Sequence, residues 1–174
     1  MQIREAKPED AEAIARVHLA SWKTTYPGLI PQNYIDGLRV EDGIARWKER
    51  LGTPDDALVF VAQDAAGVFG FAAGGAMVHT VEGFDGELGA IYLLARHQRR
   101  GAGRALVRAV AEALQARAFR SMVVWALREN PACGFYERLG GVKVGEQPIT
   151  IGGVALPEVA YGWREIGQLA ASGQ

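Results

Sequence analysis

The heptapeptide Gln98-Arg99-Arg100-Gly101-Ala102-Gly103-Arg104 carries more information than any other part of this sequence. It follows an apolar run, Leu88 to Leu94, and precedes a segment whose apolar residues recur at helical spacing. A strand, a glycine-rich turn and a helix start leave several backbone N–H groups pointing one way without an intrahelical partner. The helix dipole adds partial positive charge there, and glycine lets an anion approach the backbone. The stretch therefore predicts a phosphate or pyrophosphate site.

This turn matches some phosphate-binding patterns and not others. The phosphate loop G-x-x-x-x-G-K-S/T is absent. The dinucleotide pattern G-x-G-x-x-G matches at Gly101 and Gly103, but its third position is Leu106, which is too large for close helix–strand packing. The pattern Q-x-x-G-x-G remains. A tight strand-to-helix turn that needs glycine for structural reasons alone is an equally open interpretation.

Three further blocks accompany the turn. The segment from Ser121 to Leu127 is typical of a buried strand, because it is rich in β-branched and aromatic residues. It leads into Asn130-Pro131-Ala132-Cys133-Gly134-Phe135-Tyr136-Glu137-Arg138-Leu139-Gly140-Gly141. The other two blocks are the head, Ser21-Trp22-Lys23-Thr24-Thr25-Tyr26-Pro27-Gly28-Leu29-Ile30-Pro31, and the tail, Glu158-Val159-Ala160-Tyr161-Gly162-Trp163.

Taken in the order of the chain, the four blocks resemble the GNAT superfamily of N-acetyltransferases. The heptapeptide is similar to the acetyl-coenzyme A signature R/Q-x-x-G-x-G/A of that family, and the resemblance spans Ile3 to Trp163. Two features depart from the family pattern. The interval from Asn130 to Tyr136 is one residue shorter than usual, which leaves the alignment of Asn130 open. The usual L-G-F is replaced by Leu139-Gly140-Gly141.

Composition narrows the class of protein. A chain of 174 residues with 49% hydrophobic and 22% charged residues is typical of one soluble globular domain. A net charge of −1 gives no electrostatic footprint for nucleic acid. The single cysteine, Cys133, excludes an intramolecular disulfide and fits a reducing cytosol. Since no apolar signal core or membrane-spanning run is evident, we expect a cytoplasmic protein without membrane partners.

Periodicity and turn signals predict an α+β fold with a mixed, mostly antiparallel sheet of about seven strands and helices on both faces. We expect one domain over residues 1–166 and a flexible tail over residues 167–174. The expected strands are 2–6, 58–63, 68–79, 87–94, 121–127, 142–151 and 154–163, and the longer helices are 8–22, 32–38, 40–51 and 102–117.

The resemblance implies that the fourth and fifth strands splay apart and that coenzyme A lies between them. It implies acetyl-CoA as cosubstrate and no metal. The cofactor-binding residues that it implies are Ile91, Tyr92, Leu93, Gln98, Arg99, Arg100, Gly101, Ala102, Gly103, Arg104, Asn130 and Tyr136. For the three arginine side chains, contact with a phosphate and a solvated basic face remain open interpretations.

Three groups are candidates for the chemistry. Through the resemblance, Tyr136 is expected to protonate the departing thiolate, and the backbone N–H of Leu93 to bind the acetyl oxygen. Glu87 is our choice for a base or water-positioning group, with His79, expected at the end of the third strand, in reserve. In an unbulged strand Glu87 and Leu93 share a face, although a bulge reverses this parity. A solvated strand-edge carboxylate is an equally open interpretation of Glu87.

The acceptor side is expected to include Trp22, Tyr26 and Glu87, which together suit a small cationic amine. Tyr34 and Trp47 fall in the same segment, where aromatic residues more often belong to the core. His18 is expected to be structural, His97 to lie at the rim of the cofactor turn, and Cys133 to fill space.

The resemblance implies an acetyl-CoA-dependent N-acetyltransferase that acetylates a primary amine by direct attack in a ternary complex, and we expect that amine to be a small molecule. A homodimer is a further expected partner. A peptide N-terminal or lysine acetyltransferase, a non-catalytic acyl-CoA sensor on the same scaffold and a dinucleotide-binding domain are the alternatives.

Overall fold

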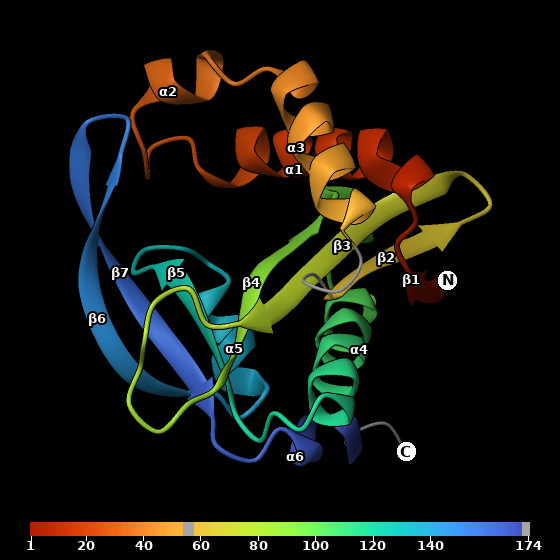
Figure 1. Ribbon diagram of the computed structural model, residues 1–174. Coiled ribbons are helices and arrows are strands. Elements are labelled where there is room, and N and C mark those ends of the chain that lie inside the picture. Colours follow the sequence, from red (N-terminus) through yellow and green to blue (C-terminus); the bar gives the residue numbers. More distant parts are fainter. Residues whose placement is uncertain (54–57, 172–174) are drawn as a thin grey trace.

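The computed structural model describes residues 1–53 and 58–171, and the elements follow the order expected from the sequence (Figure 1). Two 3-10 turns precede α1 and α4, at Pro8–Asp10 and Ala95–His97. The strands are β1 (Gln2–Glu5), β2 (Leu58–Asp64), β3 (Gly67–Ala76), β4 (Gly86–Leu93), β5 (Met122–Leu127), β6 (Val142–Ile151) and β7 (Val154–Trp163). The helices are α1 (Ala11–Thr25), α2 (Gln32–Asp36), α3 (Val40–Gly52), α4 (Ala102–Ala116), α5 (Cys133–Arg138) and α6 (Gly167–Ala171).

All seven strands form one sheet in the order β1-β2-β3-β4-β5-β7-β6. Every neighbouring pair is antiparallel except β4 and β5. Helices α1 and α3 cover one face, and α4 covers the other (Figure 1). The predicted α+β class and mostly antiparallel sheet are confirmed.

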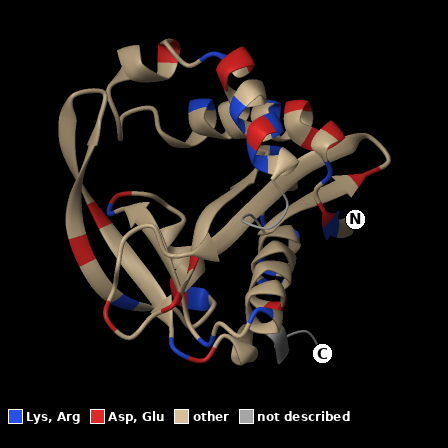
Figure 2. Ribbon diagram, viewed as in Figure 1, with Lys and Arg blue, Asp and Glu red and all other residues tan. Residues whose placement is uncertain are grey.

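Each face has its own apolar core. The face under α4 buries Leu106, Val110 and Leu114 completely, because they recur at helical spacing and point toward the sheet. The opposite face packs Ile14 of α1 against Phe71 of β3, again with no exposed surface. The outer surfaces of α1 and α3 carry acidic and basic residues interspersed (Figure 2). The sheet is therefore buried on both sides along β2, β3 and β4.

The parallel pair β4 and β5 separates almost at once. Only Gly86 with Met122 and Glu87 with Val123 are paired, although both strands continue. Beyond these pairs the facing edges of β4 and β5 do not bond to each other, so the sheet opens toward the C-terminal ends of the two strands. The predicted splay between the fourth and fifth strands is confirmed.

A β-bulge at Gly89 interrupts β4 inside the splayed region. Leu88 pairs with Gly74 and Ala90 pairs with Ala73, which leaves Gly89 without a partner on β3. A bulge of one residue reverses the faces of all later side chains relative to the earlier ones. The register of β4 therefore changes just where the sheet opens.

The segment after residue 166, which is expected to be a flexible tail, begins with a helix. Residues Gly167–Ala171 form α6, and Ile166 and Leu169 are buried in the core beside α4. This apolar pair gives the end of the chain enough buried surface to dock. The rest of the predicted tail, residues 172–174, lies outside the described residues.

Candidate active site

The turn between β4 and α4 has the conformation that its glycine predicts. Gly101 is the N-cap of α4, with φ of +85°, and Arg99 also has a positive φ of +58°. The first N–H groups of a helix have no intrahelical acceptor, and no side-chain cap at Gly101 accepts from those of α4. A Cβ at Gly101 would meet nothing within 4 Å. The turn therefore presents free backbone donors to open space, as an anion site requires.

Gly103 also has a packing role. A Cβ there would lie 3.2 Å from the ring of Phe135 and 3.4 Å from a methyl of Leu93. The missing side chain thus lets α4 pack closely against α5 and the end of β4. Gly103 brings these three elements together, and only Gly101 borders the open side of the turn.

The backbone at the end of β4 faces the splay. Leu94 donates its N–H to Phe69 at 2.9 Å, so Leu94 is in the hydrogen-bonded register with β3. Along an antiparallel strand, only alternate residues direct their N–H and C=O groups toward the neighbouring strand. Because Leu94 does so, the N–H and C=O groups of Leu93 and Ile91 point away from β3. The carbonyl oxygen of Leu93 accepts hydrogen bonds from Ser21 Oγ at 3.3 Å and Gln98 Nε2 at 3.2 Å. The sequence assigned no role to Ser21, because a serine inside a helix carries no signal for such a contact.

Tyr136 lies on α5, directly after Phe135, and only 4% of its surface is exposed. Its ring is 6.0 Å from that of Tyr161 and 6.4 Å from that of Trp163. Burial raises the pKa of the Tyr136 hydroxyl above its usual value, and the nearby Tyr92 raises it further. Among the described residues, this hydroxyl has no hydrogen-bond partner. The group is therefore protonated at neutral pH and free to donate.

Asn130 and Tyr26 connect the head of the chain to the loop after β5. The amide nitrogen of Asn130 donates to the Tyr26 hydroxyl at 3.5 Å, and its Oδ1 accepts from the N–H of Ala132 at 2.9 Å. The Tyr26 ring lies 4.7 Å from that of Trp22, whose indole nitrogen is buried without a hydrogen-bond partner among the described residues. Three of the predicted site residues thus meet beside the splay. Burial raises the pKa of Tyr26.

Glu87 and Leu93 lie on opposite faces of the sheet, so the shared face expected for an unbulged strand is wrong. Leu88 and Leu93 both pack in the core under α4, because the bulge reverses the parity between them. Glu87, the neighbour of Leu88, therefore faces α1 and α3. Its carboxylate is buried and accepts a hydrogen bond from the N–H of Val78 at 2.8 Å. A solvated strand-edge carboxylate is thus excluded.

His79 does not lie at the end of the third strand. β3 ends at Ala76, and His79 is exposed in the loop that follows. His18, in contrast, packs against the ring of Tyr92 at 4.6 Å, and burial lowers its pKa to about 4. A neutral, partly buried ring packed on Tyr92 fits the structural role predicted for His18.

His97 and Cys133 both make structural contacts. His97 stacks on Phe69 at 4.1 Å between ring centroids, and its Nε2 is 3.3 Å from Asp64. Cys133 donates its thiol to the carbonyl of Leu127 at 3.5 Å, and burial raises its pKa. A raised pKa leaves the thiol protonated, which fits the predicted role of filling space.

The remaining candidates spread over the surface and the core. The side chains of Arg99, Arg100 and Arg104 are exposed around the turn. Trp47 packs on Phe71 at 5.0 Å in the core of the α1 face, and so is remote from solvent. Tyr34 is 38% exposed on α2, with its ring 6.1 Å from that of Trp22. Of the predicted acceptor residues, Trp22 and Tyr26 are therefore close together and Glu87 lies farther along β4.

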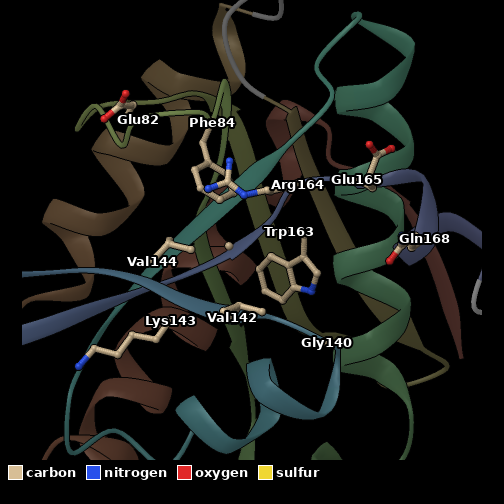
Figure 3. Close-up of a pocket in the computed structure, with 11 residues that line it drawn as sticks. Glu82, Phe84, Gly140, Val142, Lys143, Val144, Trp163, Arg164, Glu165 and Gln168 are labelled. Carbon is tan, nitrogen blue, oxygen red and sulfur yellow. The ribbon is translucent and has the colours of Figure 1, made fainter.

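A cavity of about 540 Å³ lies away from these residues, at the opposite end of β5 and β7 (Figure 3). Phe84, Trp163 and Arg164 line it, and the Arg164 guanidinium is 5.0 Å from the Phe84 ring. It does not include the turn or the open end of β4. The candidate active site is instead the region where β4 and β5 separate, next to the Gly101 turn.

Neither a metal-binding cluster nor a membrane-spanning helix is evident over residues 1–53 and 58–171. No group of three or more histidine, cysteine or acidic side chains is placed to hold a metal ion in these ranges. Within the same ranges, no helix combines the length and apolar character needed to cross a membrane.

Comparison with known proteins agrees with this geometry. The FR47-like protein family matches residues 67–148. The uncharacterized N-acetyltransferase YuaI of Bacillus subtilis (strain 168) is 46% identical over 168 residues, which are 96% of this chain and 95% of YuaI.

Two solved structures share the fold. One is yncA of Salmonella typhimurium with its cofactor acetyl-CoA, which has a TM-score of 0.70 at 20% identity over 95% of this chain and 94% of that chain. The other is the paia N-acetyltransferase of Thermoplasma acidophilum in complex with coenzyme A, with a TM-score of 0.66 at 20% identity over 90% and 96%.

Proposed function

Since the chain belongs to the GNAT superfamily of N-acetyltransferases, we propose that it transfers the acetyl group of acetyl-CoA to a primary amine by direct attack in a ternary complex. The acceptor is a small-molecule amine. The observation that carries this proposal is the meeting of the Gly101 turn, the outward-facing backbone of Leu93 and α5 beside an open edge of the sheet.

The residues present fit acetyl-CoA. The free N–H groups after Gly101 suit a pyrophosphate, and a Cβ at Gly101 would project into the open space that the anion needs. The N–H groups of Ile91 and Leu93 line the splay, where no strand uses them. When bound, acetyl-CoA supplies an activated acyl group as a thioester.

Each part of the site has a task in this reaction. The Leu93 N–H donates a hydrogen bond to the acetyl oxygen, and this stabilises negative charge that develops on it. The carbonyl of Leu93 is held by Ser21 and Gln98, which fixes the peptide geometry at this position. The Tyr136 hydroxyl, protonated and without a partner, donates a proton to the departing sulfur.

The acceptor amine must lose a proton before it attacks. An amine with a lysine-like pKa near 10.4 is only about 0.04% neutral at pH 7, a penalty of about 4.6 kcal/mol. Glu87 is buried, lies on the face opposite to Leu93 and Tyr136, and is held by Val78. We assign it the removal of this proton through ordered water, because Glu87 lies six residues before Leu93 on β4; the amine then approaches from the α1 side of the sheet.

The test is turnover of acetyl-CoA with a panel of primary amines and one peptide substrate, followed by release of free thiol. The proposal expects amine-dependent thiol release with at least one small amine. Coenzyme A binding without turnover on any amine would instead identify an acyl-CoA sensor. Acetylation confined to the peptide would move the acceptor to a protein terminus or lysine.

A further inference from the structure

Glu158 is a buried carboxylate that lacks a cation. Only 6% of its surface is exposed, and its Oε1 accepts one hydrogen bond, from Gln147 Nε2 at 2.7 Å. Within the part of the chain that the structure describes, no lysine, arginine or histidine forms an ion pair with it. An ionised carboxylate can accept about four hydrogen bonds, so the neutral Gln147 amide satisfies a fraction of its capacity.

The position of Glu158 places it on the acceptor side. Val159, Tyr161 and Trp163 of β7 pack in the core under α4, so Glu158, one residue earlier, faces the opposite side. It lies across from Leu127, at the open end of β5. Leu127 in turn packs with Tyr26, next to Trp22.

Trp125 shares this face of the sheet and pairs with Ala160, two residues after Glu158 on β7. It is two residues before Leu127 on β5, and its ring reaches across β7 to within 3.3 Å of a Cβ built on Gly145 of β6. The small residues Ala160 and Gly145 beneath it let the indole lie along the sheet. Its Nε1 is buried without a hydrogen-bond partner in the described ranges. An aromatic face beside a carboxylate is the usual pairing for an alkylammonium ion.

We propose that Glu158, Gln147 and Trp125 form a subsite for a second ammonium group on the acceptor, so the substrate is a diamine or polyamine. This inference rests on the proposed function. The reacting amine lies near Leu93, and the second nitrogen is held across the splay by the Glu158 carboxylate. The ammonium group of the substrate would form the ion pair that Glu158 lacks. It would thereby offset the desolvation cost of the buried carboxylate.

A structural role makes a different prediction. If Glu158 only links β6 to β7 through Gln147, then Glu158→Gln preserves an acceptor for that bond and changes no substrate preference. If it binds an ammonium, the same isosteric change removes the charge that selects diamines. The two roles therefore differ in acceptor selectivity and not in folding.

The experiment compares cadaverine with pentylamine and putrescine with butylamine, which differ only in the second amino group. The wild type is expected to prefer each diamine in kcat/KM by about 30-fold or more, the cost of removing one partner of a buried charge pair. Glu158→Gln is expected to lose this preference. The matched control is Glu146→Gln, an exposed carboxylate on β6 paired with Arg128 and Lys143, which should leave the preference unchanged.

Equal kcat/KM for diamine and monoamine in the wild type would overturn the inference whether or not Glu158→Gln folds. An unchanged preference in a folded Glu158→Gln protein would overturn it too. If no amine is turned over, calorimetric titration of cadaverine and pentylamine into the coenzyme A complex decides the same question. Failure to bind coenzyme A would contradict the proposed function itself, which separates the two failures.

Discussion

Replacing Gly101 with valine tests whether the turn binds the pyrophosphate of coenzyme A. Gly101 has φ of +85°, and a Cβ built on it meets nothing within 4 Å. The added Cβ therefore meets no neighbouring atom in the free protein. Its cost is backbone strain, about 1–3 kcal/mol in the free energy of unfolding, because an L side chain disfavours a left-handed φ. Relief of that strain rotates the adjoining peptide groups and moves the free N–H groups out of line.

The expected loss of affinity follows from those N–H groups. Each hydrogen bond to a charged group contributes about 1.5–3 kcal/mol, so losing one weakens the Kd for coenzyme A by about 10- to 100-fold. At a ligand concentration of about 100 times the wild-type Kd, bound coenzyme A stabilises the wild type by about 2.7 kcal/mol. A variant with a 100-fold weaker Kd keeps only about 0.4 kcal/mol of this stabilisation.

Calorimetric titration and thermal unfolding, each with coenzyme A, measure these two quantities. Gly153→Val is the matched control, since Gly153 has φ of +80°, equally open surroundings and a place at the tip of the β6–β7 hairpin. Both variants should lose a similar amount of stability without ligand, and only Gly101→Val should lose affinity. Equal affinity for coenzyme A in the two variants would refute the assignment of the turn.

Three further predictions concern catalysis and pH. Glu87→Gln keeps an acceptor for the Val78 N–H, so the variant should fold. Its kcat/KM should fall by about 10²- to 10⁴-fold near neutral pH, because the group that removes the amine proton is lost. In a pH–rate profile this deficit should shrink at higher pH, where the amine loses its proton to solvent. Burial lowers the pKa of His18 to about 4, so the unfolded chain binds more protons below pH 6.5, and the free energy of unfolding should fall by about 3 kcal/mol between pH 6.5 and pH 4. Denaturant titrations of the wild type and His18→Gln check this, and equal losses would contradict it. The Arg4 guanidinium lowers the pKa of Asp10 through two hydrogen bonds of 2.6 and 2.8 Å, so Asp10→Asn should cost about 1.5–3 kcal/mol at neutral pH. Stability from a lowered carboxyl pKa is lost as pH falls through the folded value, so chemical denaturation should show this deficit narrowing below about pH 4.

The sequence predicted most accurately where local signals set the structure. The hairpin at 142–151 and 154–163 has the predicted bounds, because Gly152 and Gly153 adopt the positive φ values, +58° and +80°, that a two-residue turn needs. The start of α4 was predicted at Ala102 for a similar reason, with Gly101 preceding it. Turn residues of this kind act within a few positions of themselves.

Predictions that depended on pairing between strands fared less well. The bulge at Gly89 exists because β3 and β4 slip by one residue, and the small residues of both strands give no sign of the register. Glu87 was therefore predicted on the wrong side of Leu93. The close approach of α4 to Phe135 at Gly103, and the docking of Leu169 beside α4, are likewise tertiary contacts that no local pattern determines.

Single-turnover release of thiol from acetyl-CoA by Tyr136→Phe tests the central claim most directly. This change removes a hydroxyl without a partner among the described residues, so folding and coenzyme A affinity should persist. Tyr161→Phe is the control, because Tyr161 lies 6.0 Å away and donates its hydroxyl to Glu137 at 2.8 Å, outside the proposed chemistry. We predict that Tyr136→Phe slows the single-turnover step by about 10²- to 10⁴-fold and that Tyr161→Phe does not. A wild-type rate in a folded Tyr136→Phe protein would contradict the account and leave Tyr136 with a packing role alone.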